Sequence, residues 1–381
     1  MTQHQLRILH VVSGDLWAGA EAQVCALLTA LHRRDEVTVA AVVMNPGELA
    51  NRLATAGIEV FVKDESRQNA LLLFFQLRHL MRAWRPDIVH THRQKENVLG
   101  ALAAWMSGIP SLRTAHGAAE HGVPFWHLHK LHKWLFAALD NWFAVRVQRC
   151  VVAVAEDLAE RLRAVLPGAR IEMISNGIDV ADVRAQAATG LAARPIPPPW
   201  HVAIVGRLVP VKRVDLFIAM AAELEQQHPG VYRFHVIGDG PLRATLEAQA
   251  AQCTARDCIQ FHGFQSDALT LMARMHALVN TSDHEGLPMT ALEALALDLR
   301  VIARAVGGLV PLLVGNPRAW LVDSNDQNIL AATVVAALPV LGEPPADTHH
   351  SVLLPAGYTL DASVNAYAAL YVALNAGLAS T

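Results

Sequence analysis

A glycine-containing turn between a short strand and a helix marks one stretch of the chain as a candidate site. The stretch reads TSDHEGLPMTALEALALDLRVIARAVGG and covers Thr281–Gly308. Gly286 allows the backbone to pass close to a ligand, and Pro288 suits the first turn of a helix, where its missing N–H costs nothing. Met289–Leu297 is rich in strong helix formers. The N–H groups at the start of such a helix would bind an anion.

Two carboxylates flank this predicted anion site and indicate what the anion is attached to. Glu285 lies in the loop, and Glu293 lies more than one turn into the helix. Carboxylates accept hydrogen bonds from sugar hydroxyls, while Gly286, Leu287 and Pro288 place the backbone for a diphosphate. The stretch therefore predicts a site for a nucleotide-sugar.

A pair of cations follows another expected strand. The strand His201–Val205 is followed by a Gly-Arg-Leu sequence that contains Arg207, and Lys212 precedes the expected helix Val214–Gln226. A guanidinium offers a planar fork and an ammonium a point charge, which together suit a pyrophosphate leaving group. Such a pair can also be only a solvated surface feature, but its place between a strand and a helix favours binding.

The order of these motifs resembles a large family of retaining glycosyltransferases with the GT-B fold, the glycosyl transferases group 1 or glycosyltransferase family 4. The resemblance depends on Glu285 and Glu293 with seven residues between them, on the Glu-Gly-Leu-Pro sequence, and on Gly-Arg-Leu followed by Lys212. It implies an α/β fold of two Rossmann-like doubly wound domains that face a cleft. It also implies that a sugar moves from a nucleoside-diphosphate donor, UDP or GDP, to a hydroxyl acceptor without a cofactor. No metal is expected, because cations and a helix terminus replace it and the sequence has no Asp-x-Asp motif.

The resemblance also implies a role for each matching residue. Glu285 would orient the donor sugar, and Glu293 would hold the ribose of the nucleoside. Arg207 and Lys212 would grip the diphosphate, and His116, within a Thr-x-His-Gly pattern, would contact the sugar. The leaving phosphate itself would take the proton of the acceptor, so no side chain is assigned as a general base.

Three departures from the family pattern leave other functions open. The loop that would face the acceptor and the donor phosphate is usually Gly-Gly, but here it reads Ala18-Gly19, so close backbone approach is expected only at Gly19. Arg300 ends a segment that is usually Gly-x-Pro, and Pro311 replaces a usual glutamate. One alternative is a catalytically weak or inactive binding partner, and another is a nucleotide-sugar epimerase. A sugar phosphorylase would need a pyridoxal lysine, for which the sequence has no motif.

Composition limits the class of protein. The chain has 381 residues, of which 53% are hydrophobic and 17% charged, and this suits a core-rich enzyme of two domains. A formal charge of −3 does not indicate the excess of basic residues that is typical of a nucleic-acid-binding protein. The four cysteines are scattered and are expected to be thiols. The sequence has neither a signal-like start nor a spanning apolar run, so a cytoplasmic protein is expected, and a location at the inner face of the plasma membrane stays open as an alternative.

Strands alternate with helices through both halves, which predicts two parallel sheets with ligands at the carboxyl ends of the strands. Residues 1–183 are expected to form an acceptor-binding domain and residues 184–357 a nucleotide-sugar domain. Ala185–Pro199 is expected to connect them as an exposed linker. Tyr358–Asn375 is expected to form a terminal helix that returns to the first domain.

His90 and His92 follow each other with one residue between them at the end of an expected strand. Alternation places both on one side of the sheet. A zinc pair is conceivable, but the sequence shows no third ligand. Structural hydrogen bonds or a position in the lining of the cleft are therefore expected.

The segment Val123–Arg149 mixes aromatic and basic residues. One interpretation is an aromatic core of a helix packed on the sheet. The other is an amphipathic surface that meets an acidic membrane, as an enzyme with a lipid-linked acceptor would need. Such an acceptor, or another glycan, would fit the synthesis of bacterial surface polysaccharide or glycolipid.

Overall fold

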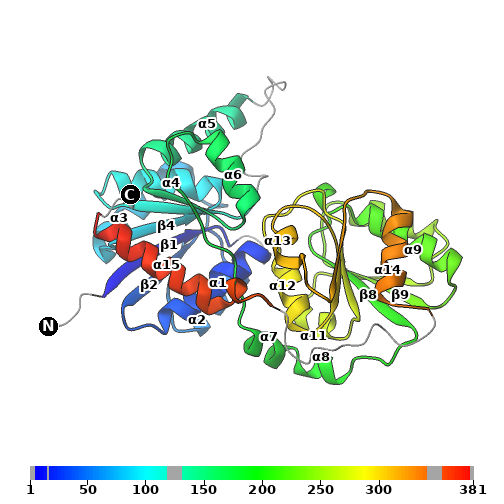
Figure 1. Ribbon diagram of the computed structural model, residues 1–381. Coiled ribbons are helices and arrows are strands. Elements are labelled where there is room, and N and C mark those ends of the chain that lie inside the picture. The colour runs from blue at the N-terminus through cyan, green and yellow to red at the C-terminus, as the bar shows by residue number, and fades with distance from the viewer. Residues whose placement is uncertain (1–4, 15–16, 118–130, 341–353, 378–381) are drawn as a thin grey trace. The chain divides into compact units, whose positions relative to one another are not determined.

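The chain folds into two compact units, shown in Figure 1. The computed structural model describes residues 5–14, 17–117, 131–340 and 354–377, with only the backbone of residues 131–135. The first unit contains Met1–Gly177 and Leu360–Thr381, and the second contains Ile178–Thr359. The division after Gly177 comes six residues before the position expected from the sequence, because the short helices that follow pack within the second unit.

The first unit has a parallel sheet of seven strands in the order β3-β2-β1-β4-β5-β6-β7. The strands are β1 Leu6–Val12, β2 Val37–Val43, β3 Glu59–Val62, β4 Ile88–His92, β5 Ser111–Ala115, β6 Cys150–Ala153 and β7 Ile171–Met173. The helices between them are α1 Gly19–His32, α2 Glu48–Thr55, α3 Ala70–Trp84, α4 Gln94–Trp105, α5 Leu131–Arg146 and α6 Glu156–Val165.

Alternating residues of β1 face two different helix layers. Ile8 and Val12 belong to a buried cluster that includes residues of α1, α2 and the terminal helix α15, Leu360–Asn375. Leu9 and Val11 belong to another cluster, which includes residues of α3 and α4. Because both faces of the sheet are covered, β1 reads as a continuous apolar run in the sequence.

The second unit repeats this plan with six parallel strands in the order β10-β9-β8-β11-β12-β13. The strands are β8 Trp200–Val205, β9 Tyr232–Ile237, β10 Ile259–Gly263, β11 Ala277–Asn280, β12 Arg300–Arg304 and β13 Ala319–Val322. The helices are α7 Val180–Gln186, α8 Ala188–Ala192, α9 Val214–Gln227, α10 Arg243–Ala251, α11 Ala268–Ala273, α12 Met289–Ala296, α13 Leu309–Leu313 and α14 Gln327–Ala337. Each sheet reverses its direction of strand addition once, between β1 and β4 and between β8 and β11.

The terminal helix α15 belongs to the first unit, as the sequence predicted for a returning helix. Figure 1 shows α15 in red beside α1. Val364, Tyr367 and Tyr371 are among its side chains in the same buried cluster as Ile8 of β1. The returning helix therefore completes the core on that face of the first sheet.

The predicted linker is partly helical. The segment Ala185–Pro199 includes the end of α7 and all of α8. It was expected to be an exposed linker, but Ala187 and Gly190 within it are buried. Asp179, in the Asn-Gly-Ile-Asp sequence, caps α7 because its side chain accepts hydrogen bonds from the N–H groups of Ala181 and Asp182. Among the described helices, none is long and apolar enough to cross a membrane.

The aromatic segment has both buried and exposed residues. Phe143 is buried in the core, whereas Phe136 and Trp142 are exposed, with 36% and 48% of their surface accessible. On the inner side of α5, Asp140 forms an ion pair with the fully buried Arg113 of β5. Phe125 and Trp126 lie outside the described residues. Neither interpretation of this segment therefore covers all of it.

Candidate functional site

Both sheets reverse their strand order at a place where polar side chains gather. Ligands of open α/β sheets bind beyond the carboxyl ends of the strands at such a point. In the second unit, the loops after β8 and β11 carry the predicted Arg207, Lys212 and Glu285. A pocket opens there, and its lining includes Gly206, Arg207, Lys212, Asn280, Ser282 and Thr290.

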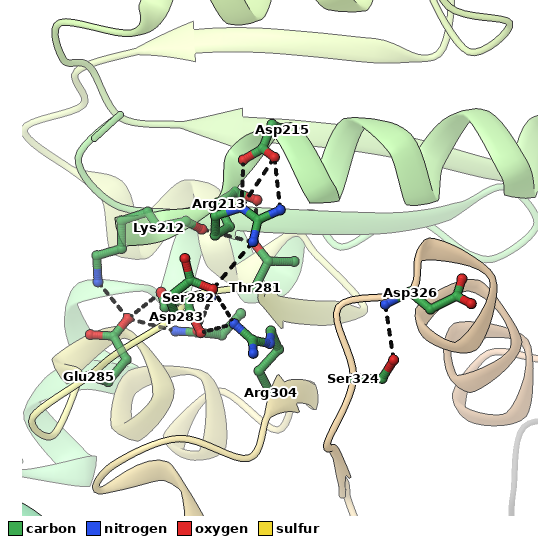
Figure 2. Close-up of polar contacts among 11 residues, drawn as sticks. Lys212, Arg213, Asp215, Thr281, Ser282, Asp283, Glu285, Arg304, Ser324 and Asp326 are labelled. Atoms are coloured by element: carbon green, nitrogen blue, oxygen red, sulfur yellow. Dashed lines mark hydrogen bonds and ion pairs between the residues drawn. The ribbon is translucent and has the colours of Figure 1, made fainter. Parts of the chain in front are cut away.

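The predicted Lys212 and Glu285 form an ion pair, shown in Figure 2. Lys212 Nζ lies 2.6 Å from Glu285 Oε1. Asn280 Nδ2 and Ser282 Oγ donate to the same oxygen at 3.1 and 2.6 Å. No described residue forms a hydrogen bond with the other oxygen, Glu285 Oε2. Three donors therefore fix one carboxylate oxygen and leave the second for a ligand.

Residues that the sequence analysis did not single out hold this arrangement together. Thr281 Oγ1 donates toward the carbonyl oxygens of Lys212 and Arg213, each at 2.9 Å. The N–H of Asp283 donates to the carbonyl oxygen of Val211 at 2.9 Å. These contacts attach the end of β11 to the turn that carries Lys212. Their adjacency to Glu285 in the sequence is the signal that could have identified them.

A second charged group lies on the outer side of the same loop (Figure 2). Asp283 accepts hydrogen bonds from Arg304 Nη1 at 2.5 Å and from Arg213 Nη1 at 3.3 Å. Arg213 also pairs with Asp215. Arg207 and Lys212 line the pocket whereas these two arginines do not, so Arg207 and Lys212 are the better candidates for a diphosphate. Arg207 is exposed, and no described residue pairs with its guanidinium.

The Gly-Asp-Gly-Pro loop after β9 supports the loop that carries Arg207. The N–H of Leu208 donates to the carbonyl oxygen of Asp239 at 2.9 Å. A Cβ added at Gly238 would lie 1.9 Å from the Gly206 carbonyl oxygen, and one at Gly240 would lie 2.6 Å from that of Leu208. Only glycine allows this approach, so the two loops have a fixed spacing.

The turn Gly286–Pro288, which leads into α12, has the geometry of an anion site. The position of Pro288 differs from the prediction. Pro288 is the N-cap of α12 and not a residue of its first turn, because its ψ of 125° is extended. No described side chain caps this helix start. The Gly286 carbonyl oxygen accepts a 2.7 Å hydrogen bond from the N–H of Gly308, which attaches the turn to the Gly307-Gly308 pair. Leu287 is buried beneath the turn.

Glu293 lies near the pocket because it is on α12, one turn after a residue that lines the pocket. It follows Thr290, which lines the pocket, by three residues, so both project from the same side of the helix. Glu293 is half-buried, and no described residue forms a hydrogen bond with its carboxyl group. Burial raises its pKa to about 7, and this carboxyl is therefore ready to gain a polar partner.

In the first unit, the predicted His116 belongs to a histidine row formed by His10, His90, His92 and His116. His10 Nδ1 lies 3.0 Å from His92 Nε2, and His92 Nδ1 lies 3.1 Å from His116 Nε2. His90 contacts Thr114 and Tyr371, each at 2.8 Å. Burial lowers the pKa of His10 to about 3 and that of His116 to about 4, and it places those of His90 and His92 well below their usual value. All four imidazoles are therefore neutral near pH 7.

The histidine row corrects one expectation. His90 and His92 lie on one side of the sheet, as predicted, but a third imidazole accompanies them. The ligand atoms of His10, His90 and His92 lie within 4.8 Å of one another. Both ring nitrogens of each of these three residues already have a hydrogen-bond partner, so a metal ion would have to displace those contacts.

The positions that depart from the family pattern have local explanations. Gly19 is the first residue of α1 and is exposed, rather than part of the preceding loop, and Ala18 has an extended φ of −142° that any residue adopts. Asp298 takes a left-handed φ of 60°, which explains why the pattern has glycine there, and Arg318 and Arg184 pair with it. Arg300 is the first residue of β12, so it lies at the amino ends of the strands, whereas the pocket lies at their carboxyl ends. Pro311 lies inside α13.

The two sheets and their helices form the GT-B fold found in solved glycosyltransferases. Anabaena HepE in complex with UDP and glucose matches with a TM-score of 0.69 at 20% identity, and the match covers 98% of each chain. A family model for Glycosyltransferase Family 4 matches residues 17–182, and one for Glycosyl transferases group 1 matches residues 194–338. The chain belongs to this family of GT-B glycosyltransferases.

Curated relatives agree with this assignment. The 2-deoxystreptamine N-acetyl-D-glucosaminyltransferase of Streptomyces fradiae is 30% identical over 302 residues, which cover 71% of this chain and 70% of that protein. The UDP-Gal:alpha-D-GlcNAc-diphosphoundecaprenol alpha-1,3-galactosyltransferase of Escherichia coli is 24% identical over 339 residues, covering 85% and 86%. For other relatives, the chain spans only 61% or 62% of their length.

Proposed function

We propose that this protein transfers a sugar from a nucleoside diphosphate, UDP or GDP, to a hydroxyl group with retention of anomeric configuration. The observation that carries the proposal is the pocket of the second unit, where Arg207 and Lys212 lie beside a helix start and the Glu285 carboxylate. The cations suit a diphosphate, and the carboxylate suits a sugar. Anabaena HepE, which shares the fold, is described in complex with UDP and glucose.

The diphosphate would bind at the positive side of the pocket. Arg207 supplies a guanidinium without a described partner, and Lys212 supplies an ammonium held at the pocket by Glu285. The first turn of α12, placed by Gly286, Leu287 and Pro288, adds backbone N–H groups. Together these groups stabilise the negative charge that develops on the leaving diphosphate.

Glu285 would orient the donor sugar. Its Oε1 is held by three donors, so the carboxylate has a fixed direction and its Oε2 can accept from a sugar hydroxyl. Glu293 would bind the ribose, and a hydroxyl there would replace the polar surroundings that its carboxyl lacks. His116 would contact the sugar at the carboxyl edge of the first sheet, and Gly19 would admit the substrate near the start of α1.

The cations and the helix start supply the positive charge that a metal ion would otherwise give, so we expect a metal-independent reaction. Purified protein with UDP- and GDP-sugars tests both parts. Slow release of the nucleoside diphosphate should persist in EDTA. Complete loss of this activity that magnesium or manganese restores would contradict metal independence. No activity with any donor would favour an inactive binding partner.

Glu285→Gln tests the assigned role because it preserves shape and removes charge. Turnover should fall roughly ten- to a thousandfold, since a charge-assisted bond contributes about 1.5–3 kcal/mol and the transition state can use it more. Affinity for the plain nucleoside diphosphate should not fall, because Lys212 then loses its negative partner. Asp283→Asn, which changes the outer charged group of the same loop, is the matched control. Full turnover by a folded Glu285→Gln variant would remove Glu285 from the mechanism.

A glycan or lipid-linked acceptor, as in surface polysaccharide or glycolipid synthesis, is the acceptor that we propose. The Escherichia coli relative is named for a diphosphoundecaprenol-linked substrate. The exposed Phe136, Leu139 and Trp142 of α5 would suit contact with the membrane that carries such an acceptor. Radiolabelled transfer to lipid extracts, compared with transfer to water-soluble glycans, distinguishes the two acceptor types.

A further inference from the structure

Four arginines and one aspartate gather at the amino ends of the strands in the second unit. Arg300 is the first residue of β12, and Arg318 directly precedes β13. Arg184 lies in the last turn of α7, and Arg194 follows α8. Asp298, between α12 and β12, pairs with two of them: its Oδ1 lies 2.8 Å from Arg318 Nη1, and its Oδ2 accepts from Arg184 Nη2. We call these five residues the arginine cluster.

Arg194 joins the cluster to the ends of two helices. Its Nε donates to the carbonyl oxygen of Ala273 at 2.7 Å, and its Nη2 donates to that of Leu297 at 2.8 Å. Ala273 is the last residue of α11 and Leu297 is the C-cap of α12, where the helix dipole is negative. The carbonyl oxygens therefore hold Arg194 in place, but they bring only partial negative charge.

The cluster carries more positive charge than its carboxylate neutralises. Four guanidinium groups and one carboxylate give the five residues a net charge of +3. Burial lowers the pKa of Arg194, Asp298 acts against this, and the positive charges of the other three arginines lower the pKa further. The arginines therefore repel one another, and an anion bound among them would relieve that repulsion.

The aspartate does not account for all four arginines. Both of its oxygens already have a partner in Arg318 and Arg184, so Arg194 and Arg300 exceed what it needs. Asp298 and Arg300 also lie where the family pattern has the uncharged Gly-x-Pro, so the charges belong to this chain and not to the general fold. An ion-pair network around one carboxylate is therefore an incomplete explanation of the cluster.

The cluster is partly buried and still accessible to a small ligand. The side chains of Arg184, Asp298 and Arg318 are 36%, 28% and 11% exposed, so solvent screens their charges only in part. A guanidinium is weakly hydrated and presents parallel N–H donors that match two oxygens of a phosphate. Phosphate is therefore an anion whose charge and geometry suit several arginines at once.

The cluster lies away from the proposed diphosphate site, although one helix joins the two. Helix α12 begins directly after Pro288 at the pocket, and its C-cap is Leu297, to which Arg194 donates. A helix of eight residues is about 12 Å long. A phosphate in the cluster therefore does not occupy the place of the diphosphate.

We propose that the arginine cluster is a second anion site, which binds a phosphate group through Arg184, Arg300 and Arg318. The phosphate is inorganic phosphate or that of a small sugar phosphate, because both present the same oxygens to the guanidinium groups. The site does not depend on the proposed transferase function, since none of its residues lines the pocket of the second unit.

Thermal denaturation of the full chain tests binding, with UDP in excess to occupy the pocket and with phosphate replacing chloride at constant ionic strength. The Tm should rise saturably, by roughly 3–7 °C at a hundredfold excess over Kd. The rise should persist in Lys212→Ala, so the result does not depend on UDP binding. Glucose 1-phosphate, titrated in the same way, distinguishes the two sources: a lower Kd than that of inorganic phosphate assigns a sugar phosphate, and an equal or higher Kd assigns inorganic phosphate.

Arg300→Gln should need at least about ten times more phosphate for the same rise, as for loss of one charge-assisted hydrogen bond. Arg256→Gln is the matched control, because it removes an arginine of the same unit whose side chain is 66% exposed and pairs with Asp257. This control should respond to phosphate like wild type.

Asp298→Asn separates a binding site from a structural network. Asparagine tolerates the left-handed backbone of this position, where φ is 60°, and it removes the one negative charge among the arginines. The variant should bind phosphate more tightly, by about tenfold, because the anion no longer competes with a carboxylate. Weaker phosphate binding by a folded Asp298→Asn would overturn the proposal.

A Tm of wild type that does not change with phosphate would also overturn it, as would equal phosphate responses of wild type and Arg300→Gln. If Arg300→Gln does not fold, Arg184→Gln takes its place with the same expectation, because Arg184 is the more exposed partner of Asp298. The expected phosphate response in a protein without transferase activity would support this site and overturn the proposed function.

Discussion

At the scale of single residues, the contact between Lys212 and Glu285 joins the two functions of the site. The ammonium that would bind the diphosphate also holds the carboxylate that would bind the sugar, at 2.6 Å. The Lys212 and Glu285 side chains are 25% and 9% exposed, so this pair is only partly screened by solvent. A change in either residue therefore affects its partner as well as the ligand.

Lys212→Ala should weaken binding of a nucleoside diphosphate about ten- to a hundredfold, since a charge-assisted hydrogen bond contributes about 1.5–3 kcal/mol. Titration calorimetry with UDP and GDP measures this. Arg213→Gln is the control, because Arg213 is the next cation in the chain but pairs with Asp215 and Asp283. Equal affinity of wild type and Lys212→Ala would contradict the diphosphate assignment.

Glu293 gives a prediction about pH. Its folded-state pKa of about 7 is above the ordinary value of 4.5, because burial disfavours the charge. The stability that comes from its buried neutral form is complete below pH 4.5 and is lost as pH rises toward 7. Glu293→Gln lacks this dependence and should be more stable than wild type at pH 8, by about 1–2 kcal/mol.

Thermal denaturation of the unliganded protein at pH 5 and pH 8 measures this difference. The exposed Glu160 provides the control Glu160→Gln, which should leave the pH dependence unchanged. An equal loss of stability between these pH values in wild type and Glu293→Gln would show that Glu293 does not cause it. The same variant should also bind nucleotide more weakly if Glu293 holds the ribose.

At the scale of elements, the strands were the most predictable part of the fold. Apolar runs such as Val37–Val43 are buried on both faces of a parallel sheet, and nothing competes with that signal. Helices α8 and α13 were missed because each has only five residues and too little periodicity to detect. Pro288 was placed one residue too far into α12 because proline is most common at the first helical position, whereas here it is the N-cap.

The loop contacts could not be predicted from the sequence for a different reason. Arg207, Lys212 and Glu285 were found through motifs, but the direct pairing of Lys212 with Glu285 joins positions 73 residues apart. His10 likewise joins His92 across 82 residues. Only the order of the strands brings such residues together, and no local pattern records it.

The spacing of the two loops after β8 and β9 gives a prediction for these elements. Gly238→Ala would place a Cβ against the Gly206 carbonyl oxygen, which would move the loop that carries Arg207. Nucleoside diphosphate binding should weaken at least about tenfold, although Gly238 itself need not touch the ligand. Gly357→Ala is the control, because nothing lies near the added Cβ there. Calorimetry with a folding check by circular dichroism would reject the prediction if both variants bind like wild type.

At the scale of the whole molecule, one topology is used twice with different edge residues. Both sheets reverse their strand order at the same relative place, but one reversal carries cations and carboxylates and the other carries the histidine row. The shared fold supplies the two edges, and the local side chains determine what each edge can bind. Apart from these two edges, the outer side of helix α5 in the first unit offers a further surface for binding.

The outer side of α5 has the composition of a membrane-contacting surface. Phe136, Leu139 and Trp142 recur every three residues and are exposed, and the exposed Arg146 and Arg149 follow them. Apolar side chains would enter the interface while the arginines attract anionic headgroups at about 1 kcal/mol each. We therefore expect the wild-type protein to float with vesicles that contain phosphatidylglycerol at low salt, and less so at high salt.

Replacing Phe136, Leu139 and Trp142 together with serine should lower the bound fraction, with a partition coefficient reduced roughly tenfold or more because three apolar side chains no longer leave water. The control replaces the exposed Phe264 and Val314 of the second unit with serine, which removes similar apolar surface elsewhere. If the control loses binding as much as the α5 variant, the contact is not specific to α5. If wild-type protein does not float with anionic vesicles at low salt, α5 is no membrane surface and the acceptor must reach the enzyme from solution.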